Sequence, residues 1–147
     1  MKNMSFTITV EQARAMKKDV TRRQGWANLQ EGEIIQQVVK GMGLKKGETV
    51  EKIHTIKVVN VTREPLMAIV TIPHRGHPLS EVEREGFPCR TANWFVDMYC
   101  QHNRCDSTDL VTRIEFRYVF VCKACQETSV LPAFCKPICT GCGELLA

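Results

Sequence analysis

The sequence predicts an α+β fold with a mixed β-sheet or small β-barrel, peripheral helices and a C-terminal metal-binding ribbon. Three observations support this prediction. Residues 50–64 and 111–121 have the β-branched content or the apolar alternation of long strands. Residues 91–102 have the apolar spacing of a helix, and two Cys-x-x-Cys pairs follow near the end of the chain. We therefore expect a body over residues 1–121 and a ribbon over residues 122–147.

The body is expected to begin with a strand and a short helix. Residues 5–10 alternate between apolar and hydroxyl side chains, which is typical of a strand. Residues 9–12, with the sequence TVEQ, match a capping box and predict a helix over residues 10–18. Lys18 is then expected at the end of this helix, and Thr21 favours an extended segment after it because β-branched residues are common in strands.

The middle of the body is rich in β-branched residues. Residues 33–40 combine these with a helical apolar stripe, so helix and strand both remain open there. Residues 50–64 predict a central strand that ends at Pro65, because proline cannot donate to a strand ladder. Residues 67–72 predict a further strand.

The last part of the body predicts a helix and a strand. Thr91 is a good N-cap, and the helix that it begins is expected to end near His102. The strand over residues 111–121 alternates aromatic and charged side chains and leads directly into Cys122. The ribbon is therefore expected to be anchored to the sheet.

The most specific chemical signal in the chain is the two cysteine pairs Cys122/Cys125 and Cys139/Cys142, with thirteen residues between the pairs. Four thiolates on two tight turns form a tetrahedral cage, which predicts a structural zinc ion. A closed cage of this kind leaves no open position for catalysis. Any catalytic activity is therefore expected in the body.

Composition and charge limit the class of protein. No apolar run approaches the roughly 20 residues of a membrane helix, and the N-terminal MKNMSFTITVEQ lacks the apolar block of a signal peptide. We therefore expect a cytoplasmic protein without a membrane partner. Because thiols stay reduced in the cytoplasm, metal binding is favoured over disulfides for the 8 cysteines. The formal net charge of +4 argues only weakly for nucleic acid.

Local basic clusters argue more strongly for a nucleic-acid ligand than the net charge does. Phosphate binding and simple solvation of helix ends and loops both remain open for them. Trp26 lies in an expected loop near the first cluster and is a candidate to stack on a base. The clusters comprise Lys17, Lys18, Arg22 and Arg23, and then Lys40, Lys45 and Lys46.

Candidate catalytic residues lie around the first basic cluster. A lysine desolvated in a cleft loses its proton more easily, so Lys18 is a candidate base that activates Thr21 or a water. Glu85, just before a Gly-Phe turn, is a candidate to pass a proton to a leaving amine. Arg22 or Arg23 would hold a carboxylate, a phosphate or a base edge. Solvated or purely structural roles remain open for all of these residues.

Residues 16–23, MKKDVTRR, resemble the Gly-x-Lys-x-x-Glu-x-Arg motif of the ASCH family, which is related in fold to the RNA-binding PUA domains. Lys18 and Arg23 match this motif, whereas Met16 replaces the glycine and Thr21 the glutamate. A bacterial ASCH branch that removes acetyl from acetylcytidine is similar here, with Lys-x-x-Thr-x-Arg and a later glutamate that Glu85 resembles, with Glu83 as the alternative.

The resemblance covers about residues 4–121 and implies a PUA-like mixed barrel with a cleft beside the first helix. It implies RNA, nucleotide or nucleoside ligands. We therefore expect an ASCH-type nucleic-acid-binding protein, which binds RNA or a modified nucleotide, with a zinc ribbon. A hydrolase of the same fold, either an acetylcytidine-type amidohydrolase or a ribonuclease, is one alternative. A protein-interaction module that docks through the ribbon is the other.

Overall fold

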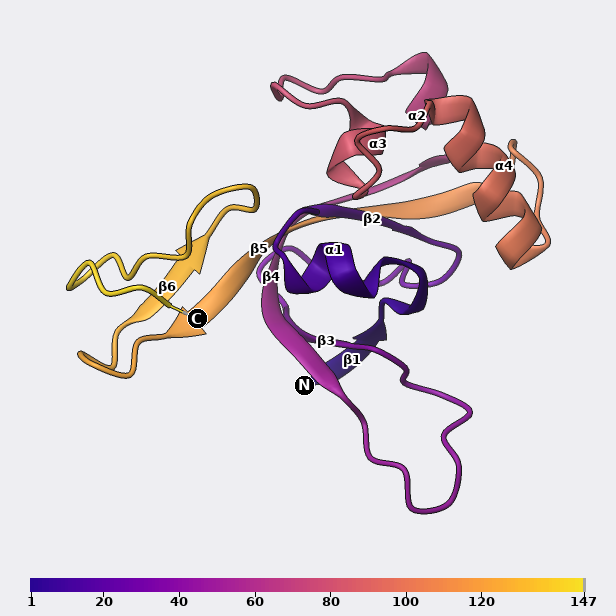
Figure 1. The fold of residues 1–147 in the computed structure, drawn as a ribbon. Helices are drawn as coiled ribbons and strands as arrows, with labels where there is room; N and C mark the ends of the chain where they lie inside the picture. Colours follow the sequence, from indigo (N-terminus) through magenta and orange to yellow (C-terminus); the bar gives the residue numbers. More distant parts are fainter. Residues whose placement is uncertain (147) are drawn as a thin grey trace.

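The computed structural model describes residues 1–146 as a mixed α+β protein, which confirms the predicted fold class at this level. Figure 1 shows a curved sheet with helices above it and the ribbon extending to one side. The elements are β1 (Lys2–Ser5), η1 (Thr7–Thr9), α1 (Val10–Arg14), β2 (Val20–Arg23), β3 (Ile34–Val38), β4 (Lys52–Pro65), α2 (Ala68–Thr71), α3 (Glu81–Arg84), α4 (Ala92–Asn103), β5 (Leu110–Val121) and β6 (Thr128–Leu131).

The six strands form one open sheet in the order β1-β3-β4-β5-β2, with β6 also paired to β5. Only β1 and β3 run parallel, and the other pairs are antiparallel. The second edge of β5 is divided between two partners: residues 112–115 pair with β2 and residues 118–121 pair with β6. The strand β5 therefore connects the ribbon with β2, the strand that begins two residues after Lys18.

The main core lies on the inner face of the curved sheet. Alternate side chains of β4 and β5 point to this face, as the period of two in a strand requires. The short helix α1 lies against the sheet between β2 and β4 in Figure 1, and Ala13 adds its side chain to the core. The buried members include Met4, Phe6, Ala13, Met16, Ile35, Ile56, Val58, Ile114, Phe116 and Tyr118.

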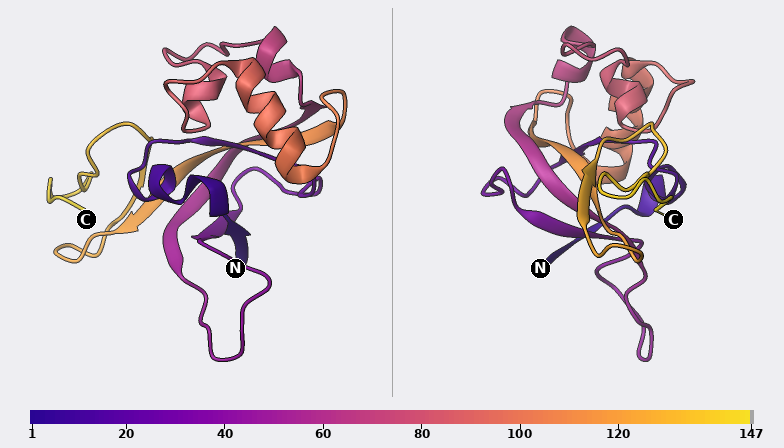
Figure 2. Two further views of the ribbon diagram at one scale, coloured as in Figure 1. Left: turned by 45° about the vertical axis from the view of Figure 1, so that its right-hand side comes forward. Right: turned by 90° about the vertical axis from the view of Figure 1, so that its left-hand side faces the viewer.

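A helical layer, formed by α2, α3 and α4, connects β4 to β5 and covers the end of the sheet away from the ribbon (Figure 2). It has a core of its own, because the apolar side of α4 packs against α2 and the adjoining strand ends. Phe95, Val96 and Tyr99 supply the α4 side of this core. The other buried members are Leu66, Ile69, Val82 and Val111.

Several predicted elements are confirmed. The central strand over 50–64 is β4, and the strand over 111–121 is β5. Thr91 caps α4 by accepting a hydrogen bond from the Trp94 backbone N–H at 3.1 Å. Residues 33–40, open between helix and strand, contain the strand β3, in keeping with the strand preference of β-branched residues.

The predicted strand over residues 5–10 and the predicted helix over residues 10–18 are wrong in their bounds. The strand β1 ends at Ser5, and the chain then forms a turn of 3₁₀-helix. The helix α1 ends at Arg14, and its N-cap makes no side-chain hydrogen bond, so the predicted capping box is absent. Met16 adopts a positive φ of 55°, which a right-handed helix cannot contain, and its side chain is drawn into the main core.

The predicted strand over residues 67–72 is also wrong, because this segment contains the helix α2. Leu66 and Ile69 are both fully buried in the second core. A helical turn places residues three apart on one face, whereas a strand would point them to opposite faces. Packing against α4 therefore overrides the strand preference of the β-branched residues. Within residues 1–146, no helix has both the length and the apolar content that crossing a membrane requires.

Candidate functional site

Lys18 is held in place by the chain segment between α1 and β2. Its carbonyl oxygen accepts a hydrogen bond of 2.6 Å from the Tyr118 hydroxyl. The next residue, Asp19, donates its backbone N–H to the Arg84 carbonyl and accepts at its own carbonyl from the Phe116 N–H. These bonds to β5 and α3 turn the Lys18 side chain inward, where it is 1% exposed. Lys18 is therefore a buried residue beyond the helix rather than the solvated end of one.

Glu85 approaches Lys18 from the end of α3. A capping box begins this helix, because the Ser80 and Glu83 side chains each accept a backbone hydrogen bond from the other residue. The turn after Glu85 depends on Gly86, which has a φ of +105° and whose hypothetical Cβ would lie 2.9 Å from the Gln12 Cγ. Only glycine accepts both this conformation and this close approach. The turn places Glu85 in the interior, with a buried side chain.

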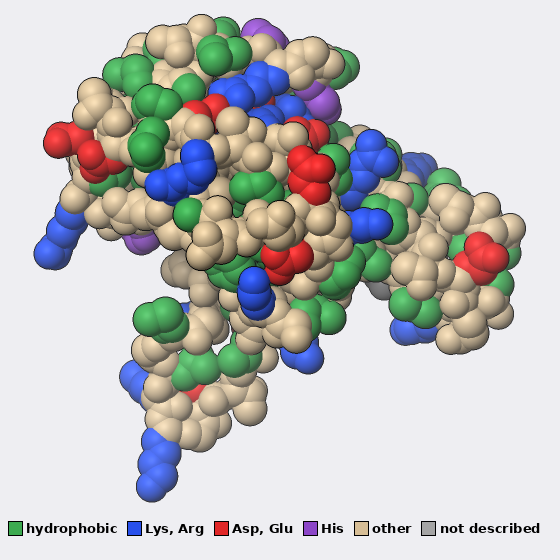
Figure 3. Space-filling view, turned by 180° about the vertical axis from the view of Figure 1, so that it is seen from behind, with side chains coloured by type: hydrophobic (Ala, Val, Ile, Leu, Met, Phe, Trp, Pro, Cys, Tyr) green, Lys and Arg blue, Asp and Glu red, His purple; other side chains and the backbone are tan. Residues whose placement is uncertain are grey.

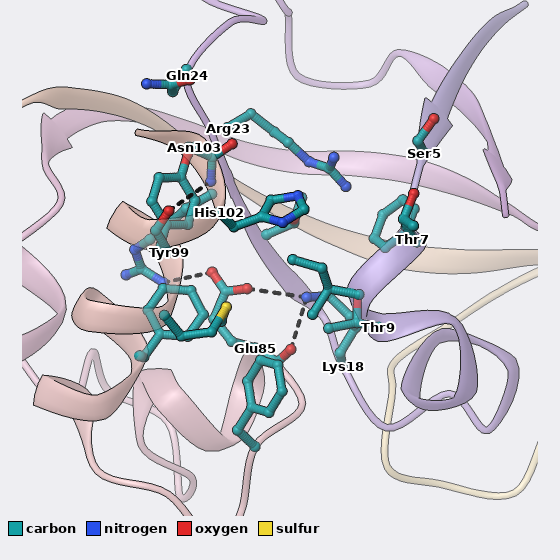
Figure 4. Close-up of a pocket in the computed structure, with 17 residues that line it drawn as sticks. Ser5, Thr7, Thr9, Lys18, Arg23, Gln24, Glu85, Tyr99, His102 and Asn103 are labelled. Carbon is teal, nitrogen blue, oxygen red and sulfur yellow. Dashed lines mark hydrogen bonds and ion pairs between the residues drawn. The ribbon is translucent and has the colours of Figure 1, made fainter. Parts of the chain in front are cut away.

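The two side chains form a direct ion pair, as the dashed lines in Figure 4 show. The Lys18 Nζ lies 3.0 Å from the Glu85 Oε2 and donates a second bond of 2.8 Å to the Glu85 carbonyl oxygen. The other carboxylate oxygen of Glu85 accepts from the Arg22 Nη1 at 2.9 Å. Burial lowers the pKa of Lys18, although the Glu85 carboxylate opposes this effect. A lysine in this environment loses its proton more readily than one on the surface.

A cavity of about 250 Å³ opens beside this pair. Lys18, Thr21 and Glu85 all contribute to its lining, so the structure brings the three predicted catalytic residues to one site. Arg23 lines the same cavity, with its guanidinium carbon 4.8 Å from the centre of the Phe6 ring. The remaining lining residues are Ser5, Phe6, Thr7, Ile8, Thr9, Arg22, Gln24, Phe87, Phe95, Met98, Tyr99, His102 and Asn103.

Arg22 lines the cavity but is tied to carboxylates. Its side chain has no exposed surface, and its two terminal nitrogens contact Glu85, Glu81 and Glu64. These contacts make Arg22 a structural partner of Glu85. Lys45 and Lys46 belong to the loop of residues 39–51, between β3 and β4, which projects away from the rest of the molecule in Figure 1. Figure 3 shows this projection from behind, with Lys or Arg side chains at its tip.

A buried ion network lies behind the cavity, between the sheet and the helical layer. Glu81, which has no exposed surface, is at its centre. It accepts from the Arg113 Nε and Nη2 at 2.9 and 2.8 Å and from the Arg22 Nη2 at 2.8 Å, and the Arg84 Nη1 lies 3.5 Å away. Burial alone would raise the pKa of Glu81, but the charges and hydrogen bonds of Arg113 and Arg22 outweigh it and lower this pKa to about 2. The network consists of Asp19, Arg22, Glu64, Arg75, Glu81, Arg84, Arg113 and Glu115.

Trp26, Lys45 and Lys46 are not brought to the cavity. Trp26 packs against the main core and does not line the pocket. Sequence reasoning also missed functional candidates, since the cavity is lined by Tyr99 and His102 from α4. The apolar spacing of residues 91–102 predicted the helix, but nothing in that pattern indicated a cavity beside it.

The four predicted metal ligands form a cluster in the ribbon. The Sγ atoms of Cys122, Cys125, Cys139 and Cys142 all lie within 4.8 Å of one another. The Cys122–Cys142 and Cys125–Cys139 sulfur pairs are separated by 3.6 and 3.5 Å. A tetrahedral zinc site with bonds of about 2.3 Å requires sulfurs about 3.8 Å apart. The cluster therefore suits a metal ion in a closed tetrahedral site.

The two halves of this cluster repeat one backbone pattern. The Cys122 N–H donates to the Glu127 carbonyl and the Cys139 N–H to the Glu144 carbonyl, both at 2.8 Å. The N–H of Gly141 also approaches the Cys139 sulfur at 3.4 Å. Backbone N–H groups, chiefly that of Cys142, lower the pKa of Cys139 to about 6. At Cys125 the backbone hydrogen bond of Glu127 lowers the pKa, but the neighbouring thiols outweigh it and raise the pKa to about 12.

Gly143 supplies the left-handed residue of the second turn, with a φ of 77°. We expect Gly143→Ala to lower the free energy of unfolding by about 1–2 kcal/mol, since an L-residue is disfavoured in this conformation. No atom lies within 4 Å of the Cβ position, so the effect would be purely conformational. Urea unfolding would measure it, with Gly25→Ala as the control because its Cβ position is also open and it lacks a positive φ. Equal stability of the two variants would contradict this expectation.

The ribbon also contacts the segment that leads to Lys18. The Phe134 N–H donates a hydrogen bond of 2.9 Å to the Met16 carbonyl, and Ala133 joins the main core. The Phe134 ring lies against His77, with ring centres 6.5 Å apart. The loop after β6 therefore holds the chain two residues before Lys18.

The chain matches no protein-family model, no curated protein and no solved structure.

Proposed function

We propose that the chain is an ASCH-type, PUA-like domain that binds a single base of RNA or of a modified nucleotide in the cavity beside Lys18. The observation that supports this proposal is the cavity itself, with its volume of about 250 Å³. This lies just below the roughly 300–1,000 Å³ of pockets for drug-sized ligands. The space suits one base or nucleoside, whereas a nucleic-acid strand needs a long groove.

The cavity lining suits recognition of a base. Tyr99 supplies aromatic surface against which a base can pack, whereas the Phe6 ring is already covered by the Arg23 guanidinium. Asn103 supplies an amide group whose nitrogen donates to the Tyr99 carbonyl at 3.0 Å, and its carbonyl oxygen can accept from the edge of a base. A base bound here would lie against the Lys18–Glu85 pair.

A second candidate function is hydrolysis of an amide on an acylated nucleoside, and the buried contact between Lys18 and Glu85 favours it. Neutral Lys18 takes a proton from Thr21 or from a water, and the resulting oxygen attacks the amide carbonyl carbon. The C–N bond then breaks, and the proton passes from Lys18 through Glu85 to the leaving nitrogen. Water completes the reaction, so one amide and one water give a carboxylic acid and an amine.

Zinc is the metal that we propose for the four-cysteine cluster. Four thiolates in a tetrahedron select zinc or an iron–sulfur centre, and a single ion fits the sulfur separations of 3.5 and 3.6 Å. The role of the ion is structural. We place the protein in the cytoplasm, where such thiols stay available to metal.

Turnover of acetylcytidine tests the hydrolase candidate. We expect Lys18→Met to reduce acetyl release by at least about a hundredfold, the usual contribution of a general base. Lys17→Met is the matched control, since Lys17 is exposed beside the buried Lys18. Mass spectrometry of the nucleoside would measure the reaction, and an unchanged rate in folded Lys18→Met would refute the assigned role.

Titration with nucleosides tests the binding function separately. If cytidine or another nucleoside binds the wild type without turnover, base binding is retained and hydrolysis is rejected. If RNA is cleaved, the ribonuclease alternative replaces both. If no nucleoside binds the cavity and protein partners bind only when residues 122–147 are present, the protein is an interaction module.

A further inference from the structure

We propose that the ligand of the cavity carries an anionic oxygen group, a phosphate or a carboxylate, and that the guanidinium of Arg23 binds this group. The inference deepens the proposed function and rests on it, since it concerns the same cavity. The inference requires the ligand to be charged, as a nucleotide is. Recognition of the base alone would not require a charge on the ligand.

The first observation is the imbalance of charge in the cavity lining. Three cationic side chains, those of Lys18, Arg22 and Arg23, face one carboxylate, that of Glu85. Both oxygens of this carboxylate are already bonded, one to Lys18 and the other to Arg22. Nothing with a negative charge in the lining is therefore left for Arg23.

The second observation is the state of Arg23 itself. Its Nε is enclosed and has no hydrogen-bond partner within the described part of the chain. Its guanidinium lies over the Phe6 ring at 4.8 Å, so the plane is fixed beside the cavity. Burial lowers the pKa of this arginine, and the nearby Glu85 carboxylate opposes this effect only in part. An anion beside it would provide the remaining compensation for the buried charge.

The Nε atoms of Arg22 and Arg75 also lack a hydrogen-bond partner among the described residues, but other nitrogens of these arginines contact carboxylates. Arg84 contacts the carboxylates of Asp19 and Glu115, and Arg113 contacts Glu81 through two nitrogens. Buried cations are normally paired in this way, because an unpaired buried charge is costly. Arg23 has no such carboxylate contact among the described residues, and it lines the cavity. A ligand bound in the cavity would therefore supply the missing anionic partner.

The position of Arg23 also gives the expected arrangement of the ligand. In Figure 4, Arg23 and His102 lie on one side of the cavity, and Lys18 and Glu85 lie on another. The anionic group would therefore lie away from the Lys18–Glu85 pair, with the base or amide between the two. A guanidinium binds phosphate or carboxylate through two parallel hydrogen bonds, which lysine cannot reproduce.

Calorimetric titration tests the inference with defined probes. These are the four common ribonucleosides, their 5′-monophosphates, inorganic phosphate and acetate. We expect a monophosphate to bind at least about tenfold more tightly than its nucleoside, with Arg23→Gln abolishing this difference. Arg23→Lys is expected to restore only part of it. Preference for acetate over phosphate would identify the group as a carboxylate.

Arg90→Gln is the matched control. Arg90 also lies 4.8 Å from an aromatic ring, that of Trp94, but it is exposed and outside the cavity. Nucleosides that bind as tightly as their monophosphates, in both the wild type and Arg23→Gln, would overturn the inference and leave base binding intact. Phosphate or acetate that binds through Arg23 while every nucleoside fails would support the inference and reject base binding. Absence of all binding would overturn both.

Discussion

Replacing Glu81 by glutamine is expected to lower the free energy of unfolding by about 3–5 kcal/mol, the usual cost of breaking a buried ion pair. The carboxylate of Glu81 accepts hydrogen bonds from Arg22 and from two nitrogens of Arg113, and it has no exposed surface. Glutamine keeps the shape but removes the charge, so these arginines lose their central counter-ion. Urea unfolding of the variant would measure the loss.

Glu11→Gln is the matched control for Glu81→Gln. Glu11 pairs with Arg14 at 3.2 Å on the surface, where its side chain is 83% exposed. Surface pairs of this kind contribute about 0–1 kcal/mol. A loss of stability in Glu81→Gln that does not exceed the loss in Glu11→Gln would contradict the central role of Glu81.

Acid titration of the wild type gives an independent measurement of the same interaction. The pKa of Glu81 in the folded protein is about 2, below its ordinary value of 4.5. A carboxyl with a lowered pKa contributes stability above its unfolded pKa and loses it as the pH falls toward its folded pKa. The wild type is therefore expected to lose this contribution between pH 4.5 and about 2. Glu81→Gln lacks the titrating group and should lose less stability over this interval.

Replacing Cys139 by serine is expected to abolish tight zinc binding and to unfold the ribbon. Cys139 is buried within the sulfur cluster, and its loss opens the tetrahedral cage. Structural zinc contributes about 10–16 kcal/mol of apparent binding free energy in small zinc domains, and this energy is also folding energy. Zinc content by atomic mass spectrometry and proteolysis after β5 would measure the two effects.

Cys135→Ser is the matched control for Cys139→Ser. Cys135 is exposed, lies in the same ribbon and is outside the sulfur cluster. It should therefore keep one zinc ion for each chain and resist proteolysis like the wild type. Full zinc occupancy in Cys139→Ser would refute the four-thiolate site. Because Phe134 of the ribbon bonds to Met16, zinc loss should also weaken ligand binding in the cavity.

Parts of the fold that depend on local patterns could be predicted from the sequence. The strands β4 and β5 and the helix α4 have clear periodicity, and each is long enough for that periodicity to outweigh single residues. The spacing of Cys122, Cys125, Cys139 and Cys142 was equally local, and it predicted the thiol cluster.

The parts that depend on distant contacts could not be predicted. Nothing near Met16 in the sequence indicates that the chain leaves the helix there, because its side chain is held by the main core and its carbonyl by the ribbon. The sequence of α3 shows only that the segment is charged, whereas in the structure Glu81 and Arg84 are buried and form ion pairs with one another and with β5. The order of charged residues in the sequence does not predict which of them form ion pairs in the folded protein.

The candidate site shows the same division. The meeting of Lys18 and Glu85 joins residues 67 positions apart, and the resemblance to ASCH proteins, rather than any periodicity, suggested that pairing. Arg22 and Arg23 are adjacent and chemically identical, so the sequence assigned both to ligand binding. In the structure the carboxylates surrounding β2 engage Arg22 alone, and this distinction depends on three-dimensional position.

The pairing of β2 with β5 has a consequence for the synthesis of the protein. The segment from Lys18 to Arg23 leaves the ribosome early, but its strand partner β5 and the Tyr118 hydroxyl that holds Lys18 are made about a hundred residues later. Contacts of such long sequence separation form late, because loop closure must precede them. A nascent chain that stalls before β5 already contains Glu85, the side-chain partner of Lys18 and Arg22, but it lacks the strand and the Tyr118 hydroxyl that position this segment. The cavity can form only when translation of the body is complete.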